Sequence, residues 1–251
     1  MHLSHEPIYH ENSETKNLAV FIHGFMGTPH QFDGLAESVH SLGFSTAALL
    51  LPGHGSTVKD FSSTKMERWQ SHVNAEIERF SRSHQKIYLV GHSMGCLLAI
   101  NAAVKHSSSV CGLFLIAGPF KLRFFSFYST KIRLKLLFYR RSHPMKSEYL
   151  AASSVPLRPS LVWRVIKPYF ELKKLARLAK GRLQDIRVPV KAVYSKADDL
   201  VATRGLEILK AGLTHAPFEY EILSDSLHVI FPEHEQRKII RLFHRLLGED
   251  C

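Results

Sequence analysis

The pattern with the clearest chemistry is a serine between two glycines, in the run 91–95, Gly-His-Ser-Met-Gly. The run joins an apolar segment at residues 86–90, typical of a buried strand, to an almost wholly apolar segment at 96–104, typical of a buried helix. A serine on so tight a turn needs small neighbours two residues away on each side, and the glycines supply them. We therefore expect the Ser93 hydroxyl to stand above a sheet edge, where the Met94 N–H can bind a negatively charged oxygen.

A serine hydroxyl is a weak nucleophile at neutral pH and needs a base beside it. The chain holds 16 histidines, and His228 is the best placed because it follows the last expected strand, at residues 218–223. His215 precedes that strand, while His234 and His244 lie at or within the expected last helix. We expect His228 to be the general base.

An imidazole base is in turn oriented by a carboxylate. Two candidates, Asp198 and Asp199, follow the strand expected at residues 188–194. Asp198 is the preferred acid, because Asp199 is better placed to be a solvated neighbour or a helix-capping residue. The choice between the two aspartates stays open at this point.

A tetrahedral oxyanion needs a second hydrogen-bond donor. The run 23–27, His-Gly-Phe-Met-Gly, follows the first central strand, expected at residues 17–23, and its glycines let the backbone turn beneath a substrate. The Phe25 N–H can then point at the carbonyl oxygen, where one such donor is typically worth ~3 kcal/mol. We expect His23 to hold this loop rather than to transfer protons.

Strands and helices must alternate along most of the chain to position these groups. Apolar runs typical of buried strands lie at residues 17–23, 44–51, 86–90, 112–117, 188–194 and 218–223. Apolar residues at helical spacing lie at 29–42, 66–80, 96–104, 203–210 and 239–247. This alternation predicts an α/β fold in which a mostly parallel sheet carries helices on both faces.

One long segment interrupts the alternation. Residues 119–184 have no clean strand and are too many for a loop inside a compact domain. We interpret them as a helical cap inserted between two core segments, 1–118 and 185–251.

The charge is concentrated in that expected cap. The whole chain carries 33 Lys and Arg against 22 Asp and Glu, a net charge of +11, and residues 121–182 hold 16 of the cations but only two acids, Glu148 and Glu171. Such charge asymmetry is informative about binding partners rather than about the fold. The basic segment could contact an anionic lipid surface or an acidic protein such as an acyl carrier, or it could be a solvated surface that is merely basic. Nucleic acid ranks last, because no recognised binding motif accompanies the charge.

Aromatic residues alternate with cations at the start of the expected cap. Four of them, Phe120, Phe124, Phe125 and Phe127, are expected to line an acyl-chain pocket with the cations at its rim.

The composition limits the classes of protein to which the chain can belong. A chain of 251 residues with 45% hydrophobic and 22% charged residues is that of an ordinary folded domain and excludes a disordered chain. No apolar run approaches the ~20 residues that span a bilayer, and the polar residues 1–17 lack a secretory pattern. Three cysteines without metal-ligand spacing argue against a disulfide scaffold and for a reducing compartment. We expect a cytoplasmic protein, or one peripheral to the inner membrane surface, without metal or cofactor.

The motifs together resemble the α/β-hydrolase superfamily, and within it bacterial carboxylesterases and monoacylglycerol-lipase-like enzymes. The resembling runs are His-Gly-Phe-Met-Gly at 23–27, Pro-Gly-His-Gly at 52–55, Gly-His-Ser-Met-Gly at 91–95, Asp-Asp-Leu-Val at 198–201 and His-Val at 228–229. The resemblance implies Ser93 as nucleophile, Asp198 as acid and His228 as base. It also implies an oxyanion hole built from the Phe25 and Met94 amides.

The expected activity is hydrolysis of carboxylic esters through an acyl-enzyme, with no cofactor. The expected substrates are monoacylglycerols, lysophospholipids or other medium-chain acyl esters. Two alternatives remain: an esterase or thioesterase for acyl groups borne by an acidic carrier protein, and a non-catalytic binding protein that uses the basic cap. A fluorophosphonate probe separates the last from the others, since a pure binder would not react at Ser93.

Overall fold

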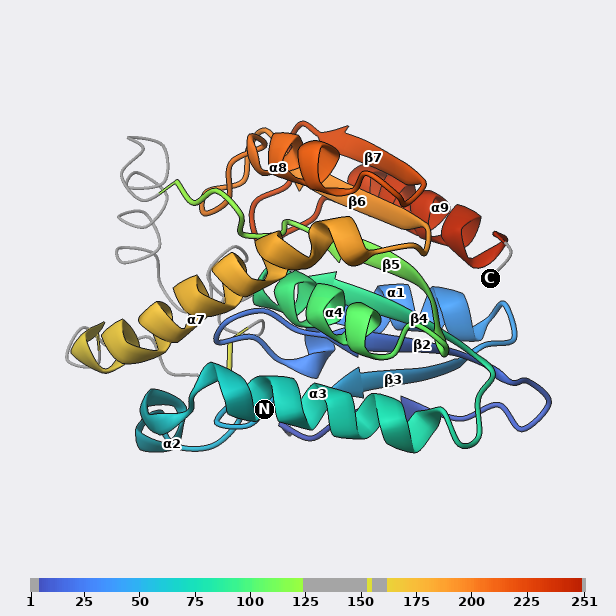
Figure 1. The fold of residues 1–251 in the computed structure, drawn as a ribbon, viewed down its shortest axis with the longest axis horizontal. Coiled ribbons are helices and arrows are strands. Elements are labelled where there is room, and N and C mark those ends of the chain that lie inside the picture. The colour runs from blue at the N-terminus through green and yellow to red at the C-terminus, as the bar shows by residue number, and fades with distance from the viewer. Residues whose placement is uncertain (1–4, 124–152, 155–161, 250–251) are drawn as a thin grey trace.

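The computed structural model describes residues 5–123, 153–154 and 162–249 (Figure 1). These residues form a seven-stranded sheet in the order β1-β3-β2-β4-β5-β6-β7. The strands are β1 Ile8–His10, β2 Asn17–Ile22, β3 Ser45–Leu49, β4 Lys86–His92, β5 Val110–Ile116, β6 Val190–Ser195 and β7 Phe218–Leu223. Every neighbouring pair is parallel except β1 and β3, which are antiparallel.

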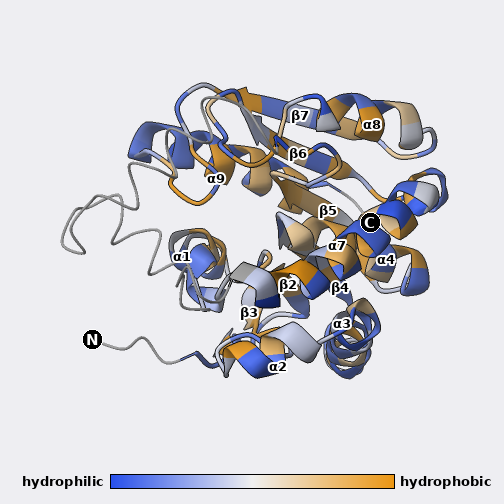
Figure 2. Cartoon of the chain, turned by 90° about the vertical axis from the view of Figure 1, so that its left-hand side faces the viewer, coloured by the Kyte–Doolittle hydropathy of each residue, from blue (hydrophilic) through white to orange (hydrophobic). Residues whose placement is uncertain are grey.

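Helices cover both faces of this sheet (Figure 2). The helices are α1 Asp33–His40, α2 Val58–Ser63, α3 Met66–Phe80, α4 Met94–Lys105, α7 Val162–Arg182, α8 Gly205–Gly212 and α9 Glu233–Leu247. One face packs against α1 and α9, and the other against α3, α4, α7 and α8. The predicted α/β architecture, with a mostly parallel sheet and helices on both faces, is confirmed.

The middle of the sheet explains the apolar runs of the sequence. β2, β4 and β5 lie between two apolar layers, so nearly all of their side chains are buried. Parallel strands covered on both faces cannot alternate between polar and apolar residues. The carboxyl ends of these strands therefore meet at one sheet edge, held rigidly by the core.

Most of the range expected for the cap, residues 119–184, lies outside the described residues, so its boundaries stay a prediction. α7 belongs to that range. Its second half packs against α4 and buries Leu172, Leu175 and Ala179 in the same apolar layer as the sheet. Its first half extends beyond the body, on the side where the strands end (Figure 1).

The two described cysteines differ in state. Cys96 is a buried free thiol, whereas Cys111 is disulfide-bonded. The expectation of a reducing compartment stays a prediction. Among the described helices, none is both long and apolar enough to cross a membrane.

Candidate active site

Ser93 occupies a strained turn between β4 and α4. Its backbone has φ of 52° and ψ of −119°, a region that residues with a side chain rarely adopt. The Ser93 N–H donates to the Ile116 carbonyl at the end of β5 over 2.8 Å, which ties the turn to the neighbouring strand. The side chain is mostly covered, with 7% of the residue exposed. Such strain persists only where the surrounding structure imposes it.

The glycines on either side of Ser93 are required by close backbone approach. A Cβ at Gly95 would lie 1.8 Å from the Ile22 carbonyl oxygen of β2, and one at Gly91 would lie 2.5 Å from the Cys96 nitrogen. Neither neighbour is a flexible side chain that could move away. The expected need for small residues at these positions is confirmed.

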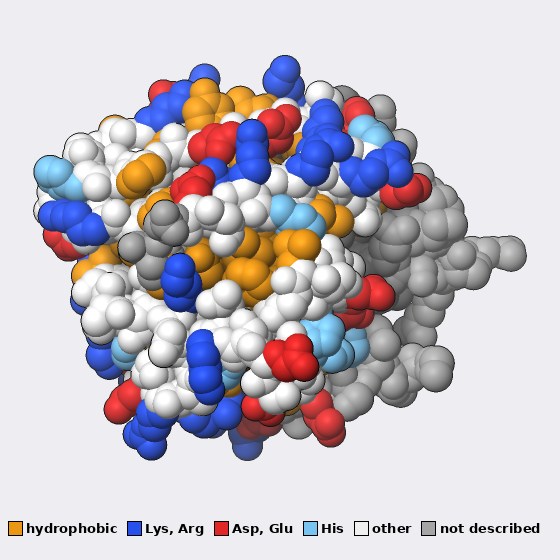
Figure 3. Space-filling view, turned by 90° about the vertical axis from the view of Figure 1, so that its right-hand side faces the viewer, with side chains coloured by type: hydrophobic (Ala, Val, Ile, Leu, Met, Phe, Trp, Pro, Cys, Tyr) orange, Lys and Arg blue, Asp and Glu red, His pale blue; other side chains and the backbone are white. Residues whose placement is uncertain are grey.

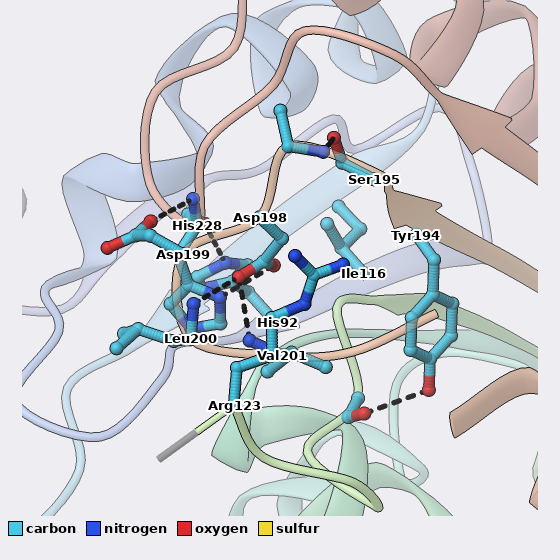
Figure 4. Close-up of polar contacts among 12 residues, drawn as sticks. His92, Ile116, Arg123, Tyr194, Ser195, Asp198, Asp199, Leu200, Val201 and His228 are labelled. Carbon is cyan, nitrogen blue, oxygen red and sulfur yellow. Dashed lines mark hydrogen bonds and ion pairs between the residues drawn. The ribbon is translucent and has the colours of Figure 1, made fainter. Parts of the chain in front are cut away.

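Asp198 and His228 lie together at the carboxyl edge of the sheet (Figure 4). Asp198 follows β6 and His228 follows β7, and the His228 Nδ1–H donates to Asp198 Oδ2 over 2.9 Å. The other carboxylate oxygen of Asp198 accepts from the Leu200 and Val201 amides at 2.7 and 2.8 Å. The carboxylate is therefore fixed on both sides, and among the described residues Nε2 of His228 has no hydrogen-bond partner.

Asp199 contacts the same histidine differently. Its Oδ1 accepts from the His228 backbone N–H over 3.1 Å, while Asp198 takes the ring nitrogen. Asp199 is buried rather than solvated, with 1% exposed. The geometry thus supports Asp198 as the acid of the pair and gives Asp199 the task of holding the His228 backbone.

His92 holds the other end of the His228 peptide. Its Nε2–H donates to the His228 carbonyl oxygen over 2.8 Å, and the two rings lie 4.9 Å apart between centroids. Because His92 precedes Ser93 in the chain, this bond joins the turn of the serine to the loop of the histidine. Within the described part of the chain, no hydrogen bond joins the Ser93 hydroxyl to His228. Such bonds are often long in the absence of substrate.

Burial and charge set the pKa values of the buried pair. Burial acts to lower the pKa of His228, but the charge and hydrogen bond of Asp198 and the charge of Asp199 outweigh it, so the pKa is raised. Burial likewise acts to raise the pKa of Asp198, but the His228 charge and hydrogen bond and two amides outweigh it, so that pKa is lowered. The pair therefore favours a charged imidazole beside a carboxylate, the state that proton transfer from serine produces.

The amides of Phe25 and Met94 are available as donors. Met94 is the first residue of α4, where backbone N–H groups have no partner within the helix. Among the described residues, neither the Phe25 N–H nor the Met94 N–H has an acceptor. The neighbouring Met26 carbonyl accepts from the Ser154 N–H at 2.8 Å, so a described residue of the expected cap rests on this loop.

Two buried histidines hold the loop of Phe25. His23 donates from Nδ1 to the Gly24 carbonyl and accepts from the Leu51 N–H at Nε2, at 2.9 and 3.0 Å. His54 accepts from the Met26 N–H at 3.1 Å, a role that the sequence analysis missed. Burial lowers the pKa of His54 to about 4 and that of His23 well below its usual range, so both rings are neutral. The expectation that His23 holds the loop agrees with these bonds.

A buried carboxylate, which the sequence analysis also missed, holds the loop before His228. Glu235 on α9 is fully buried and accepts from the Ser224, Asp225 and Ser226 amides, and from the Ser226 hydroxyl. Burial acts to raise the pKa of Glu235, but these hydrogen bonds outweigh it and the pKa is lowered. The signal in the sequence was an acid on the apolar face of the last helix.

The same carboxylate belongs to a group with metal-ligand spacing. Asp225, His234 and Glu235 place ligand atoms within 4.8 Å of one another. However, both Glu235 oxygens already accept backbone N–H groups, and His234 Nε2 pairs with Asp225 at 3.3 Å. These interactions account for the group, and we assign it to holding the loop.

Only one of the four aromatic residues expected to bind substrate, Phe120, lies among the described residues. Phe120 is described, half-buried against the apolar layer of α4, with its N–H bonded to the Gly118 carbonyl at 2.9 Å. Phe124, Phe125 and Phe127 lie outside the described residues. Their role stays a prediction.

The fold and the site together define a class of protein. A mostly parallel sheet with a serine at a strand-to-helix turn, and an aspartate and a histidine after later strands, is the architecture of an α/β-hydrolase. The chain belongs to the serine aminopeptidase S33 family, whose sequence profile matches residues 13–235. It is a serine hydrolase of the lipase and esterase type.

Two relatives of similar sequence are named as lipid-ester hydrolases. The chain is 27% identical over 241 residues to the thermostable monoacylglycerol lipase of Bacillus sp. (strain H-257), covering 94% of this chain and 91% of that protein. It is 32% identical over 110 residues to the probable lysophospholipase BODYGUARD 4 of Arabidopsis thaliana, covering 43% of this chain and 26% of that protein.

Solved structures share the fold. A structure from work on two metagenome-derived lipolytic enzymes, LipS and LipT, has a TM-score of 0.75 at 21% identity and covers 98% of this chain and 99% of that chain. The monoacylglycerol lipase of Paleococcus ferrophilus has a TM-score of 0.69 at 18% identity, covering 96% and 98%. At these identities the likeness concerns the fold alone.

Proposed function

We propose that the protein hydrolyses carboxylic esters of acyl chains, with Ser93 as nucleophile, His228 as base and Asp198 as acid. The observation that carries the proposal is the buried Asp198–His228 pair, bonded over 2.9 Å and joined through His92 to the turn of Ser93. A strained serine, joined through its neighbour His92 to a histidine whose pKa is raised by a carboxylate, supports the activation of a hydroxyl.

The proposed reaction has two halves. His228 Nε2 takes the proton of Ser93 as the hydroxyl oxygen attacks the ester carbonyl, and Asp198 stabilises the imidazolium that results. The Phe25 and Met94 amides hydrogen-bond the oxyanion, and collapse of the intermediate expels the alcohol with the proton from His228. Water, activated by His228, then attacks the acyl-Ser93 ester and releases the carboxylic acid.

Relatives and sequence support an acyl ester as the substrate. The relative that matches along most of the chain is a monoacylglycerol lipase, and a shorter match is a probable lysophospholipase. The strained Ser93 turn and the free Phe25 and Met94 amides require only that the substrate carry an acyl carbonyl. We therefore propose monoacylglycerols, lysophospholipids or similar medium-chain esters.

The test is removal of the nucleophile. Ser93→Ala should lower turnover of a p-nitrophenyl acyl ester by at least about 10³-fold and abolish labelling by a fluorophosphonate probe, because no other group supplies the attacking oxygen. Ser71→Ala, at an exposed position of α3, is the matched control and should keep wild-type activity. Circular dichroism checks that both variants fold.

Two results would contradict the proposal. Retained ester hydrolysis in Ser93→Ala would remove Ser93 as nucleophile. A folded wild-type protein that neither hydrolyses the ester nor reacts with the probe would instead favour a binding protein on a hydrolase scaffold.

A thioesterase for a carrier-borne acyl group is the second candidate. The observation in its favour is the exposed face of α7, whose charged side chains are all cations, since opposite charges speed the encounter with an acidic carrier. Comparing kcat/KM for acyl carrier thioesters with that for free esters, at low and high salt, decides between the candidates. Preference for the carrier that disappears at high salt would favour the thioesterase.

A further inference from the structure

The outer face of α7 has an unusual composition. From Trp163 to Lys180, every exposed side chain is either large and apolar or positively charged. No exposed acid lies on this helix. This composition departs from the mixture of signs that keeps an ordinary surface in water.

The first half of this face is apolar. Trp163, Ile166 and Phe170 are 64%, 53% and 55% exposed. They follow one another at steps of three and four residues, which places them on one side of the helix. Leu172, Leu175 and Ala179 fill the inner side against the core. On the outer side, the described contacts of Trp163 and Phe170 are with the Arg164 guanidinium and the Tyr169 ring of the same helix, and they leave the apolar group exposed.

The second half of the face is cationic. Lys173, Lys174, Arg177 and Lys180 are exposed there, and Lys167 stands among the apolar residues. The one acid of the helix, Glu171, is buried and is occupied by the Met66 N–H at 3.2 Å and by Lys174 at 2.7 Å. The other cations therefore have no acid on their own helix to neutralise them.

The opposite side of the molecule looks different. Figure 3 shows that Lys and Arg are intermingled there with Asp and Glu. The Trp163 end of α7, by contrast, projects on the side where the strands end, which is also the edge that carries Ser93, Asp198 and His228 (Figure 1). A surface touched by this end of α7 would thus lie beside the candidate site.

We propose that the outer face of α7, defined as Trp163, Ile166, Lys167, Phe170, Lys173, Arg177 and Lys180, docks on an anionic lipid bilayer. The large apolar side chains would enter the boundary between headgroups and acyl chains, where tryptophan is favoured, and the cations would contact anionic headgroups. An acidic protein could pair the cations, but it would not by its charge explain three large apolar side chains at the projecting end.

The inference rests on the proposed function, because a lipid ester held in that bilayer is what docking would bring to Ser93. Docking itself needs no turnover. Binding can therefore be measured on the Ser93→Ala protein, so that failure of docking and failure of catalysis are observed separately.

The chain contains a suitable fluorescent reporter. Of its two tryptophans, Trp69 is fully buried and Trp163 is exposed. Vesicles of mixed phosphatidylglycerol and phosphatidylcholine should shift the emission to shorter wavelength, whereas phosphatidylcholine alone should not. Trp163→Phe should remove the shift, which assigns the signal to α7.

Matched variants test both halves of the face by vesicle sedimentation. Ile166→Ser with Phe170→Ser should weaken binding by more than about ten-fold, and so should Lys173→Glu with Arg177→Glu and Lys180→Glu. The control carries the same change of charge on exposed cations elsewhere, Arg82→Glu with Lys105→Glu and Arg241→Glu, and should lose much less. All three variants should keep wild-type kcat/KM for a water-soluble p-nitrophenyl ester.

Four outcomes would overturn docking on lipid. They are equal binding to vesicles with and without anionic lipid, equal losses in the α7 and control charge variants, an emission shift that survives Trp163→Phe, and binding of an acidic acyl carrier or a second copy of the chain in place of vesicles.

Discussion

At the scale of single residues, two adjacent aspartates serve one histidine in different ways. Asp198 binds the ring of His228 and Asp199 binds its backbone N–H. Their side chains are equally buried and differ by one position in the chain, so only the direction in which each points separates the acid from the anchor. The difference can be measured, because an amide oxygen can replace the contact of Asp199 with the His228 N–H but not the contact of Asp198 with the His228 ring.

Asp198→Asn should lower kcat/KM by about 10³ to 10⁴-fold, because an amide cannot hold the required tautomer or stabilise the imidazolium. Asp199→Asn should cost less than about ten-fold, because its amide oxygen can still accept from the His228 N–H. A larger loss in Asp199→Asn than in Asp198→Asn would reverse the two roles. Initial rates on one p-nitrophenyl ester measure both.

The pH profile of the same enzymes gives a second prediction. In the proposed mechanism His228 can act as a base only when it is neutral, and Asp198 and Asp199 raise its pKa above the ordinary 6.5. Wild-type kcat/KM should therefore rise with pH through a midpoint above 6.5, and both Asn variants should move that midpoint to lower pH. A midpoint unchanged by Asp199→Asn would show that its charge does not reach the ring.

At the scale of elements, α9 fixes the loop that presents His228. Glu235 accepts three successive backbone amides of that loop from a fully buried position. A helix that packs on the sheet core thus determines where the loop of His228 lies, through one carboxylate rather than through an apolar contact.

Glu235→Gln should lower the free energy of unfolding by about 2–4 kcal/mol, because an amide NH₂ would face backbone donors and charged hydrogen bonds would be lost. It should also lower kcat, since the loop would no longer hold His228 in place. Glu233→Gln, on the same helix but with a mostly exposed side chain, is the control and should change either quantity little. Urea unfolding and initial rates measure the two effects, and equal behaviour of the two variants would contradict the role.

At the scale of the whole molecule, burial of neutral histidines predicts lability in acid. Burial lowers the pKa of His54 to about 4 and of His92 to about 3, and that of His23 well below 6.5. The unfolded chain binds protons at these positions first, so the free energy of unfolding should fall as pH drops below 6.5. The slope is at most about 1.4 kcal/mol per pH unit for each histidine.

His228 does not offset this fall in the free energy of unfolding below pH 6.5. Its raised pKa contributes stability that is present below 6.5 and is lost as pH rises through the folded value. Urea unfolding across the acid range should show the predicted slope, and His54→Gln should reduce it while the exposed His215→Gln should not. Identical slopes in the two variants would contradict a contribution from His54.

The sequence predicts strands and helices correctly where their side chains are fully buried. β2, β4 and β5 were predicted because strands covered on both faces must be apolar throughout, and the glycines of the Ser93 turn follow from atoms that leave no room for a Cβ. β1 escaped prediction, because a three-residue edge strand with exposed positions has no apolar signal. α2 also escaped, although its capping box of Thr57 and Asp60 is a local signal of a helix start.

The sequence by itself determined which groups could do the chemistry: a serine at a glycine-flanked turn, a histidine after the last strand, and an aspartate after the strand before it. Only the tertiary structure decided which aspartate meets the ring. It also placed His92, His54 and Glu235 as anchors of the loops that carry Phe25 and His228, and the outer face of α7 toward solvent. Motifs are local and survive in a linear sequence, whereas hydrogen bonds between residues 136 positions apart, as between His92 and His228, exist only once the chain has folded.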